Sequence, residues 1–245
     1  MIYNISYSLC GKKQLLALTS LFLLTISSSV YGQHESNLTY GVKFGALHST
    51  ISNLPESIKG RDQTFTDNYY SSKGKYGVEG GLFLNYKLPN SRTAIQPELL
   101  IRTAGEKIQY NDPQGLQKEI GFDYTYLSLG ALYKIYPYEG LNLGVGAFYS
   151  INLSPHAVSY QSNEADGLYD VTTRQFYREG FNGGDDFSLS FSLGYELRQS
   201  IHFDLRYSLG VKDVIKSYSN SFQFVENENR TGIISFTIGY SFHKW

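Results

Sequence analysis

Large apolar residues occupy every second position over much of this chain. Residues 187–197 read FSLSFSLGYEL and residues 201–211 read IHFDLRYSLGV, with Ser, Gly or charged residues between the apolar ones. A period of two predicts β-strands, because successive side chains of a strand point to opposite faces. The pattern predicts eight strands, at about 38–47, 76–88, 93–103, 122–135, 141–153, 187–198, 201–211 and 231–243. Phe83 breaks it, because it lies on the otherwise polar face of its strand.

The segments between these strands alternate in length. Three are short and read PNSR, YPYEG and QS. Four are long, polar and rich in Gly, Asn and Asp, at roughly 48–75, 104–121, 154–185 and 212–230. This asymmetry is typical of an up-and-down barrel in a bacterial outer membrane, with short periplasmic turns and long extracellular loops.

The composition of the two faces indicates which of them meets lipid. The polar face mixes Gly and Ser with ions of both signs, which suits a narrow lumen, whereas Gly on a solvated surface would only weaken a strand. A soluble barrel of the lipocalin type, with its apolar face inside, is the alternative. We therefore predict an all-β fold, an eight-stranded antiparallel transmembrane β-barrel. Aromatic residues near the strand ends predict girdles at the two membrane boundaries: Tyr76, Tyr86, Tyr133, Tyr149, Tyr207, Tyr240 and Trp245.

The first 32 residues resemble an export signal. Lys12 and Lys13 precede the apolar run QLLALTSLFLLTIS, and small residues follow in SSSVYG. We predict a cleaved signal peptide at 1–32 and a barrel domain at 33–245. After the signal no apolar run approaches the roughly 20 residues of a membrane-spanning helix. The expected location is the bacterial outer membrane, with outer-membrane lipid as the first partner.

Composition narrows the function classes. The net charge of −1 gives no electrostatic attraction to nucleic acid. The 22 Tyr residues suit a boundary between lipid and water. Cys10 is the only cysteine and lies in the predicted signal, so neither a disulfide framework nor thiol chemistry is expected in the mature chain.

The polar face would place charges of both signs inside the barrel. Unpaired charges are costly there, so we expect a network of ion pairs that plugs the lumen, with an ion pathway as the alternative. Glu98 has Arg102 or Arg206 as a candidate partner, and Glu196 has Arg198 or Lys134. The predicted lumen network comprises Lys43, Glu79, Glu98, Arg102, Lys134, Glu196, Arg198, Asp204 and Arg206.

Candidate catalytic and metal sites are weak. The five histidines are scattered without paired spacing, so no metal site and no cofactor are expected. A lipid-acting hydrolase would need Ser, His and a carboxylate together at the membrane rim. His156 with Ser154 or Ser159 supplies two of these groups in the longest loop. The available carboxylates are Glu164, Asp166 and Asp170. We favour loop decoration for this set and expect no enzymatic activity.

The order of the segments resembles the PorT-like outer-membrane β-barrel family over residues 38–243. QPELL at 96–100 followed by Gly105 is the most particular piece. The others are YGVKFGAL, YGVEGGLFLNYKL, YTYLSLGALYKI, LNLGVGAFYSINL, DDFSLSFSLGYEL, IHFDLRYSLGV and IISFTIGYSF. The resemblance implies an outer-membrane location and a small closed barrel. Some relatives are tied to protein secretion and gliding.

Together these features predict an integral outer-membrane barrel with a plugged lumen and a structural or surface-contact role through its outer loops. Extracellular or periplasmic protein partners are expected, and nucleic acid is not. A component of a secretion or envelope-assembly machinery and a lipid-modifying barrel enzyme are the alternatives.

Overall fold

The computed structural model describes residues 37–54, 69–163, 171, 174–175, 178–197, 200–217 and 228–242. The predicted signal peptide at 1–32 lies outside the described residues. So do Arg198 and Trp245, and the three loop carboxylates at 164, 166 and 170.

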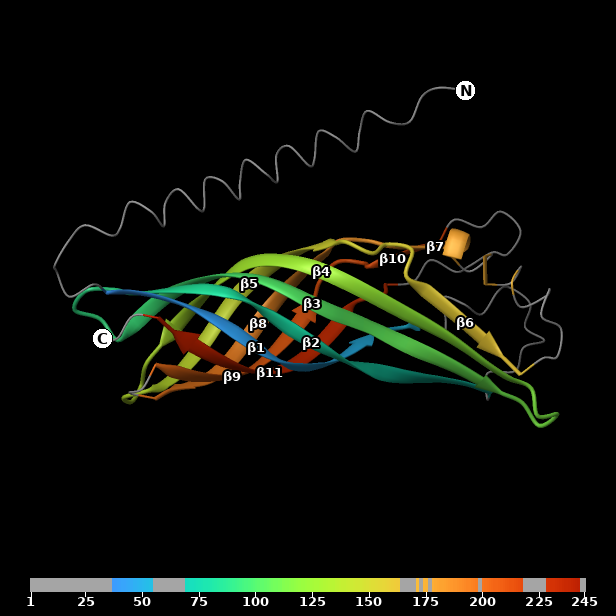
Figure 1. The fold of residues 1–245 in the computed structure, drawn as a ribbon, viewed down its shortest axis with the longest axis horizontal. Coiled ribbons are helices and arrows are strands. Elements are labelled where there is room, and N and C mark those ends of the chain that lie inside the picture. Colours follow the sequence, from blue (N-terminus) through green and yellow to red (C-terminus); the bar gives the residue numbers. More distant parts are fainter. Residues whose placement is uncertain are drawn as a thin grey trace, which may run out of the picture. The chain divides into compact units, whose positions relative to one another are not determined.

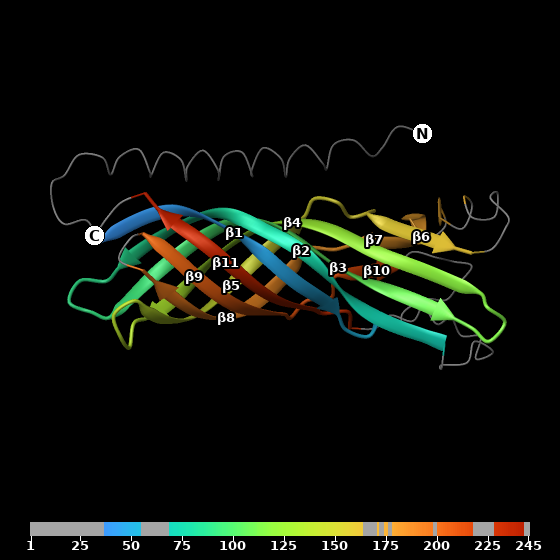
Figure 2. The same cartoon turned by 60° about the horizontal axis from the view of Figure 1, so that its bottom comes forward.

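Eight long strands close into a ring. Each pairs antiparallel with its neighbours in the order β1-β2-β3-β4-β5-β8-β9-β11, and β11 pairs with β1 (Figures 1 and 2). The ring strands are β1 (Leu38–Ile51), β2 (Tyr70–Lys87), β3 (Thr93–Asn111), β4 (Gln117–Ile135), β5 (Leu141–Asn152), β8 (Asp186–Glu196), β9 (Ile201–Gly210) and β11 (Thr231–Ser241). A closed ring leaves no unpaired edge in the hydrocarbon, as a membrane barrel requires. The predicted eight-stranded antiparallel barrel is confirmed.

Three further strands lie at the outer end, opposite the short turns. β6 (Val158–Ser162) pairs with the outer end of β4, and β7 (Phe181–Gly183) pairs with β10 (Ile215–Ser217). Among the described residues, none of the helical segments is both long enough and apolar enough to cross a membrane.

Each of the three short turns contains a left-handed residue among those that the structure describes. These residues are Asn90 (φ 56°), Gly140 (φ 80°) and Ser200 (φ 70°). Gly and Asn adopt this conformation at little cost, and Ser200 is held by a hydrogen bond from its amide to the carbonyl of Leu197 at 3.2 Å.

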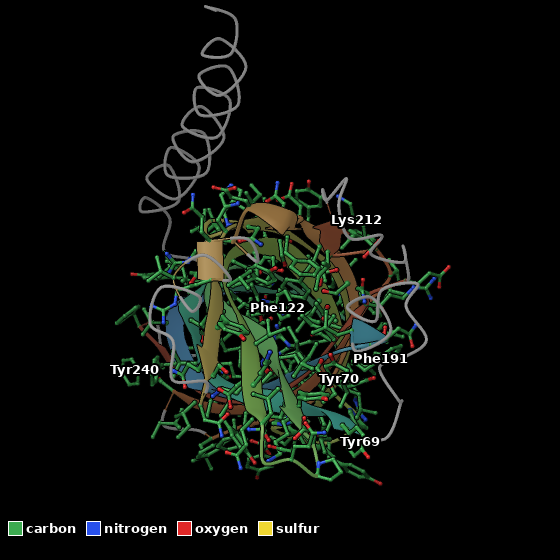
Figure 3. The ribbon with its side chains drawn as sticks, turned by 90° about the vertical axis from the view of Figure 1, so that its right-hand side faces the viewer. Tyr69, Tyr70, Phe122, Phe191, Lys212 and Tyr240 are labelled. Atoms are coloured by element: carbon green, nitrogen blue, oxygen red, sulfur yellow. The ribbon has the colours of Figure 1, made fainter. Side chains whose placement is uncertain are left out.

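The barrel is apolar outside and polar inside. About half of the Phe191, Leu205 and Ile238 side chains is exposed, at 53%, 48% and 50%, whereas Ser190 and Arg206 are at most 1% exposed. Figure 3 looks along the barrel and shows Phe191 and Tyr240 on the outside of the ring. This is the orientation that a lipid-facing outer surface requires.

β2, β3 and β4 continue well past the other ring strands at the outer end (Figure 1), and β2 pairs with β3 out to Tyr70↔Tyr110. The β3–β4 ladder runs without a break from Thr93↔Ile135 to Asn111↔Gln117. The expectation of a long loop at 104–121 is therefore wrong, because most of that segment is strand. Only the tip at 112–116 turns. Asp112 accepts hydrogen bonds from the amides of Gln114 and Leu116 there, and Gly115 has a φ of 85°.

Candidate functional site

A carboxylate at the centre of the lumen holds two cations. Lys43 Nζ donates to Glu98 Oε1 at 2.7 Å, and the Arg206 guanidinium reaches both Glu98 oxygens at 2.8 and 3.0 Å. Gln96 Nε2 donates to the same carboxylate at 2.7 Å, and Asp204 contacts Arg206 at 3.1 Å. The network thus joins β1, β3 and β9 across the barrel. Of the two partners considered for Glu98, the structure places Arg206 against it.

One aromatic ring contacts both lumen arginines. Phe148 points inward from β5 and is fully buried, with the Arg206 guanidinium 5.0 Å and the Arg102 guanidinium 5.7 Å from its ring centroid. Leu100 and Leu132 pack with Phe148. Cation–π contact of this kind is favourable where the cation is desolvated. Phe148 was not among the predicted lumen residues. The alternation places it on the same face of β5 as Asn142 and Gly146, so the pattern could have indicated its inward position.

Arg102 donates to the hydroxyl of Ser128 rather than to Glu98. Its Nε donates to Ser128 Oγ at 2.8 Å, and Ser128 Oγ lies 2.7 Å from Ser150 Oγ. Glu79 is 1% exposed and lies directly opposite Arg102 in the β2–β3 ladder. The carboxylate and the guanidinium are therefore neighbours on adjacent strands, although no hydrogen bond joins them.

A second carboxylate cluster lies at the end of the barrel where the short turns are. Glu196 accepts a hydrogen bond from the Tyr136 hydroxyl at 2.7 Å, and His202 Nδ1 lies 3.7 Å away. Lys134 and Lys87 approach the same carboxylate at 3.8 and 4.0 Å. Glu196 is thus near Lys134, one of its two candidate partners, and the other lies outside the described residues.

Packing explains why Phe83 lies on the otherwise polar inner face of its strand. It is 4% exposed in the lumen, and its ring meets the His202 ring edge-on at 5.3 Å between centroids. A methyl group at Gly41 would come within 2.6 Å of the Phe83 ring, and one at Gly239 within 3.3 Å. Glycines on β1 and β11 therefore provide the space that this ring fills.

Little room remains beside these side chains. A cavity of about 10 Å³ lies between the Glu98 cluster and the Glu196 cluster and is lined by Lys43, Phe83 and Glu196 among others. That volume accommodates about one water molecule.

The predicted girdle tyrosines all project outward, between 42% and 82% exposed. They form two sets, and the tyrosines of the periplasmic set are Tyr86, Tyr133 and Tyr240. The outer set comprises Tyr76, Tyr149 and Tyr207.

Beyond the outer set the polarity of both faces inverts. On the outer face of β4, Leu129 and Leu127 give way to Thr125, Asp123 and Glu119. On the inner face, polar residues give way to apolar ones that build a buried core. This core comprises Leu47, Ile51, Leu54, Ala104, Ile108, Ile120, Phe122, Tyr124, Tyr126, Val158, Tyr160, Phe181, Val214, Ile215 and Ile233. Figure 3 shows Phe122 inside the ring outline. Such a pattern is that of a water-soluble fold, so this part stands outside the membrane.

We call this part the outer lobe: the ends of β3 and β4 beyond Thr103 and Thr125, with β6, β7 and β10. The predicted strands stop short of the lobe because, beyond this point, the apolar residues of β3 and β4 lie on the inner face instead of the outer face. Asp112-Pro113 followed by Gly115 is a turn signature that could have revealed the hairpin.

Two features mark the lobe as a candidate binding region. A polar pocket of about 400 Å³ lies at its tip, lined by side chains that are mostly carboxamides. Its residues are Gln109, Asn111, Gln117, Lys118, Glu119, Gln161, Ser162 and Asn163. The second feature is a buried acid, Glu106, which is 3% exposed and accepts a hydrogen bond from the Ile51 amide. Burial raises the pKa of Glu106 to about 7, and the Ile51 hydrogen bond opposes that shift.

Both serines considered for hydrolysis donate their hydroxyls to the backbone of β4. Ser154 Oγ donates to the carbonyl of Asp123 and Ser159 Oγ to that of Gly121, both at 3.4 Å, while His156 is exposed. Among the described residues no group of three or more metal-binding side chains is close enough to hold an ion.

A sequence model of the outer membrane protein beta-barrel domain family matches residues 28–216. The chain belongs to this family. Its location is therefore the bacterial outer membrane, with the short turns in the periplasm and the outer lobe outside the cell. Curated proteins give no significant match to this outer-membrane barrel.

Solved outer-membrane proteins resemble the barrel at low sequence identity. Neisserial surface protein A has a TM-score of 0.40 at 10% identity, covering 84% of this chain and 98% of its own. OprG from Pseudomonas aeruginosa has a TM-score of 0.40 at 15% identity, covering 86% and 98%. The attachment invasion locus protein Ail of Yersinia pestis has a TM-score of 0.36 at 13% identity, covering 84% and 99%.

Proposed function

We propose that this protein is a closed, non-enzymatic outer-membrane barrel whose outer lobe makes contacts at the cell surface. The observation that carries the proposal is the contrast between the two ends of one tube. The lumen is occupied by buried ion pairs with space for about one water molecule beside them, while β3 and β4 extend outward to build a folded lobe with its own core.

Closure of the lumen has a direct electrical test. In planar lipid bilayers the wild-type protein should add no conductance above the leak. Shortening the central side chains in Arg206→Ala with Phe148→Ala should create a water-filled path and measurable conductance. A wild-type protein that conducts ions in discrete steps would contradict a plugged lumen.

The polar pocket at the lobe tip is the proposed contact surface. Carboxamides donate and accept hydrogen bonds, so this pocket suits a partner rich in hydroxyl or amide groups. Asn111 and Gln161 are exposed on its wall. Cells of a non-adherent bacterium that display the protein should adhere to protein- or glycan-coated surfaces, and Asn111→Ala with Gln161→Ala should reduce adhesion.

The control variant lacks an asparagine side chain on the opposite side of the membrane. Asn37→Ala changes an exposed residue at the periplasmic end and should leave adhesion unchanged. Equal adhesion by all three proteins and by cells without the barrel would exclude a contact role for the lobe tip.

The absence of enzymatic activity is part of the same proposal. Both candidate serines donate to backbone carbonyls of β4 instead of to His156. We expect cells carrying His156→Ala to have the same outer-membrane lipid composition as wild-type cells. A change in acyl-chain pattern on that substitution would favour a lipid-modifying enzyme instead.

We also propose that the chain lies near the PorT-like group within its family, on the basis of the ordered segments around QPELL. A role beside a secretion or envelope machinery would then act from the periplasmic turns. A photo-crosslinker at Ser91, exposed in the β2–β3 turn, should capture a periplasmic protein in living cells. A crosslinker on the outer lobe provides the comparison.

A further inference from the structure

A cavity of about 300 Å³ opens where β2 separates from β3. The β2–β3 ladder is interrupted between Gly74 and Glu79, and Ser49 Oγ of β1 bonds to both the amide and the carbonyl of Gly105 there, at 2.8 and 2.7 Å. Tyr76 stands 82% exposed beside the opening. This rim cavity is lined by Lys75, Tyr76, Thr103, Ala104, Asp123, Tyr124 and Thr125.

The rim cavity lies at the level where the lipid-facing surface ends. Val78 on β2 and Ile101 on β3 are 49% and 56% exposed below it. On β4 the outer face changes from Leu127 to Thr125 at the same place. The cavity is therefore continuous with the hydrocarbon-facing surface on one side and with the polar outer lobe on the other, which is the depth of the outer headgroups.

Positive charge gathers around the opening. Lys73 and Lys107 are directly opposite each other in the β2–β3 ladder, an arrangement of like charges that destabilises a sheet. Lys75 forms an ion pair with Asp123, and Lys107 with Glu119. On this outer face of the described strands, three lysines thus meet two carboxylates. Burial, and after it the neighbouring Lys107, lowers the pKa of Lys75.

We propose that the rim cavity binds the phosphorylated sugar headgroup of an outer-leaflet lipid. The surplus positive charge selects an anionic group, because a phosphate between the lysines relieves their mutual repulsion and gains charge-assisted hydrogen bonds. The Thr103 hydroxyl is bonded to the backbone of Val78, and the Thr125 hydroxyl in the cavity suits a sugar hydroxyl group. The continuity with Ile101 and Leu127 favours a lipid over a soluble phosphate, because the acyl chains can remain against the barrel.

The binding test uses the full barrel in detergent with lipid A as the probe. Native mass spectrometry would measure how much lipid A the barrel retains. The same measurement would be made with dephosphorylated lipid A, and with lipid A in the presence of inorganic phosphate. Lys75→Gln with Lys107→Gln should weaken lipid A binding about tenfold or more, since it removes two charged donors. Dephosphorylated lipid A should bind the wild-type protein as weakly.

The matched control is Lys212→Gln. Lys212 is an exposed lysine just beyond the outer end of β9, on the wall opposite β3 in the ring. Its substitution should change lipid A binding by no more than about twofold. Heat-modifiable gel migration reports that each variant is folded. If the double variant does not fold, Lys73→Gln leaves both ion pairs intact and should weaken binding in the same direction.

Three results would overturn the proposal. The first is unchanged lipid A binding by folded variants that lack these lysines. The second is an equal loss on Lys212→Gln, which would mean unspecific attraction. The third is displacement of lipid A by millimolar inorganic phosphate, which would assign the cavity to a soluble anion.

Discussion

Glu98 shows how a single buried residue fixes the interior of this barrel. It is fully buried, and its two oxygens receive Lys43, Gln96 and the bidentate guanidinium of Arg206. A buried ion pair of this kind adds little net stability over an apolar contact, but removal of one partner leaves the other charge uncompensated. Glu98 therefore links β3 to β1 and β9 across the lumen.

The first prediction follows from that asymmetry. Glu98→Gln should lower the free energy of unfolding by about 3–5 kcal/mol, because buried Lys43 loses the carboxylate it contacts and Arg206 keeps only Asp204. Urea unfolding in lipid vesicles measures it. Glu119→Gln is the control, since its ion pair with Lys107 is partly exposed and should contribute less than about 1 kcal/mol. Equal losses for both variants would contradict the central role of Glu98.

Glu106 gives the outer lobe a pH dependence. Its pKa is raised to about 7 in the folded lobe, above the usual carboxyl range near 4.5, so the neutral form is favoured by folding. Its contribution to stability is therefore fully present below about pH 4.5 and is lost as the pH rises through 7. Hydrogen exchange of the lobe amides should be faster at pH 8 than at pH 5, beyond the intrinsic change.

Glu106→Gln tests the assignment. The amide oxygen can still accept the hydrogen bond from Ile51, but no charge forms, so the extra exchange at pH 8 should disappear. The difference in stability at pH 8 is at most about 3.4 kcal/mol, the value of a shift of two and a half pKa units. Unaltered pH dependence in this variant would assign the effect to another group.

At the scale of elements, β3 and β4 join two environments in one hairpin. In the membrane-spanning part of these strands, apolar side chains point to the outside of the barrel and polar ones into the lumen. Beyond the membrane the two faces are exchanged. The strand period of two is kept throughout, so only the facing of the apolar side chains changes. The lobe core can therefore be weakened without loss of the membrane barrel.

Phe122→Ala makes that separation measurable. Phe122 is fully buried and meets Phe181 edge-on at 5.5 Å between ring centroids, so truncation should cost the lobe about 3–5 kcal/mol. Protease should then cut within the hairpin at 104–122 in intact cells, while heat-modifiable gel migration of the barrel persists. Joint loss of both properties would mean that lobe and barrel unfold as one unit.

The hairpin also shows the reach of sequence patterns for single elements. The eight spans were predicted to within a few residues where one face is lipid-exposed, but the ends of β1, β2, β3 and β4 at the outer side were assigned to loops. The alternation was present in Ile108 and Tyr110 and in Ile120 and Phe122. It went unnoticed because its apolar face lies opposite to that of the preceding span.

At the scale of the whole molecule, an apolar band surrounds a closed tube with tyrosines at both boundaries. Phe191 lies at the middle of β8 and is 53% exposed, a value that only a lipid environment makes favourable for so many residues of the band. Phe191→Arg should destabilise the barrel by about 2–4 kcal/mol in vesicles.

The control for this prediction lies at the membrane boundary. Val211 follows β9 at its outer end and is 43% exposed, so Val211→Arg should cost about 0–1 kcal/mol. The two side chains are similarly exposed, so a large loss of stability at Phe191 and a small one at Val211 would show that lipid and not water surrounds Phe191. Equal, small effects in vesicles would contradict a transmembrane barrel.

The sequence by itself determined the architecture, because a strand period of two, an even strand number and alternating loop lengths are local properties that any reader of the chain can count. It also placed charges on the inner face. Which charges meet was decided only by the tertiary structure, since strand register and barrel closure bring Glu98 of β3 to Arg206 of β9 across 108 residues of chain. The outer lobe and the rim cavity likewise required the assembled sheet, because both depend on where neighbouring strands leave the membrane together.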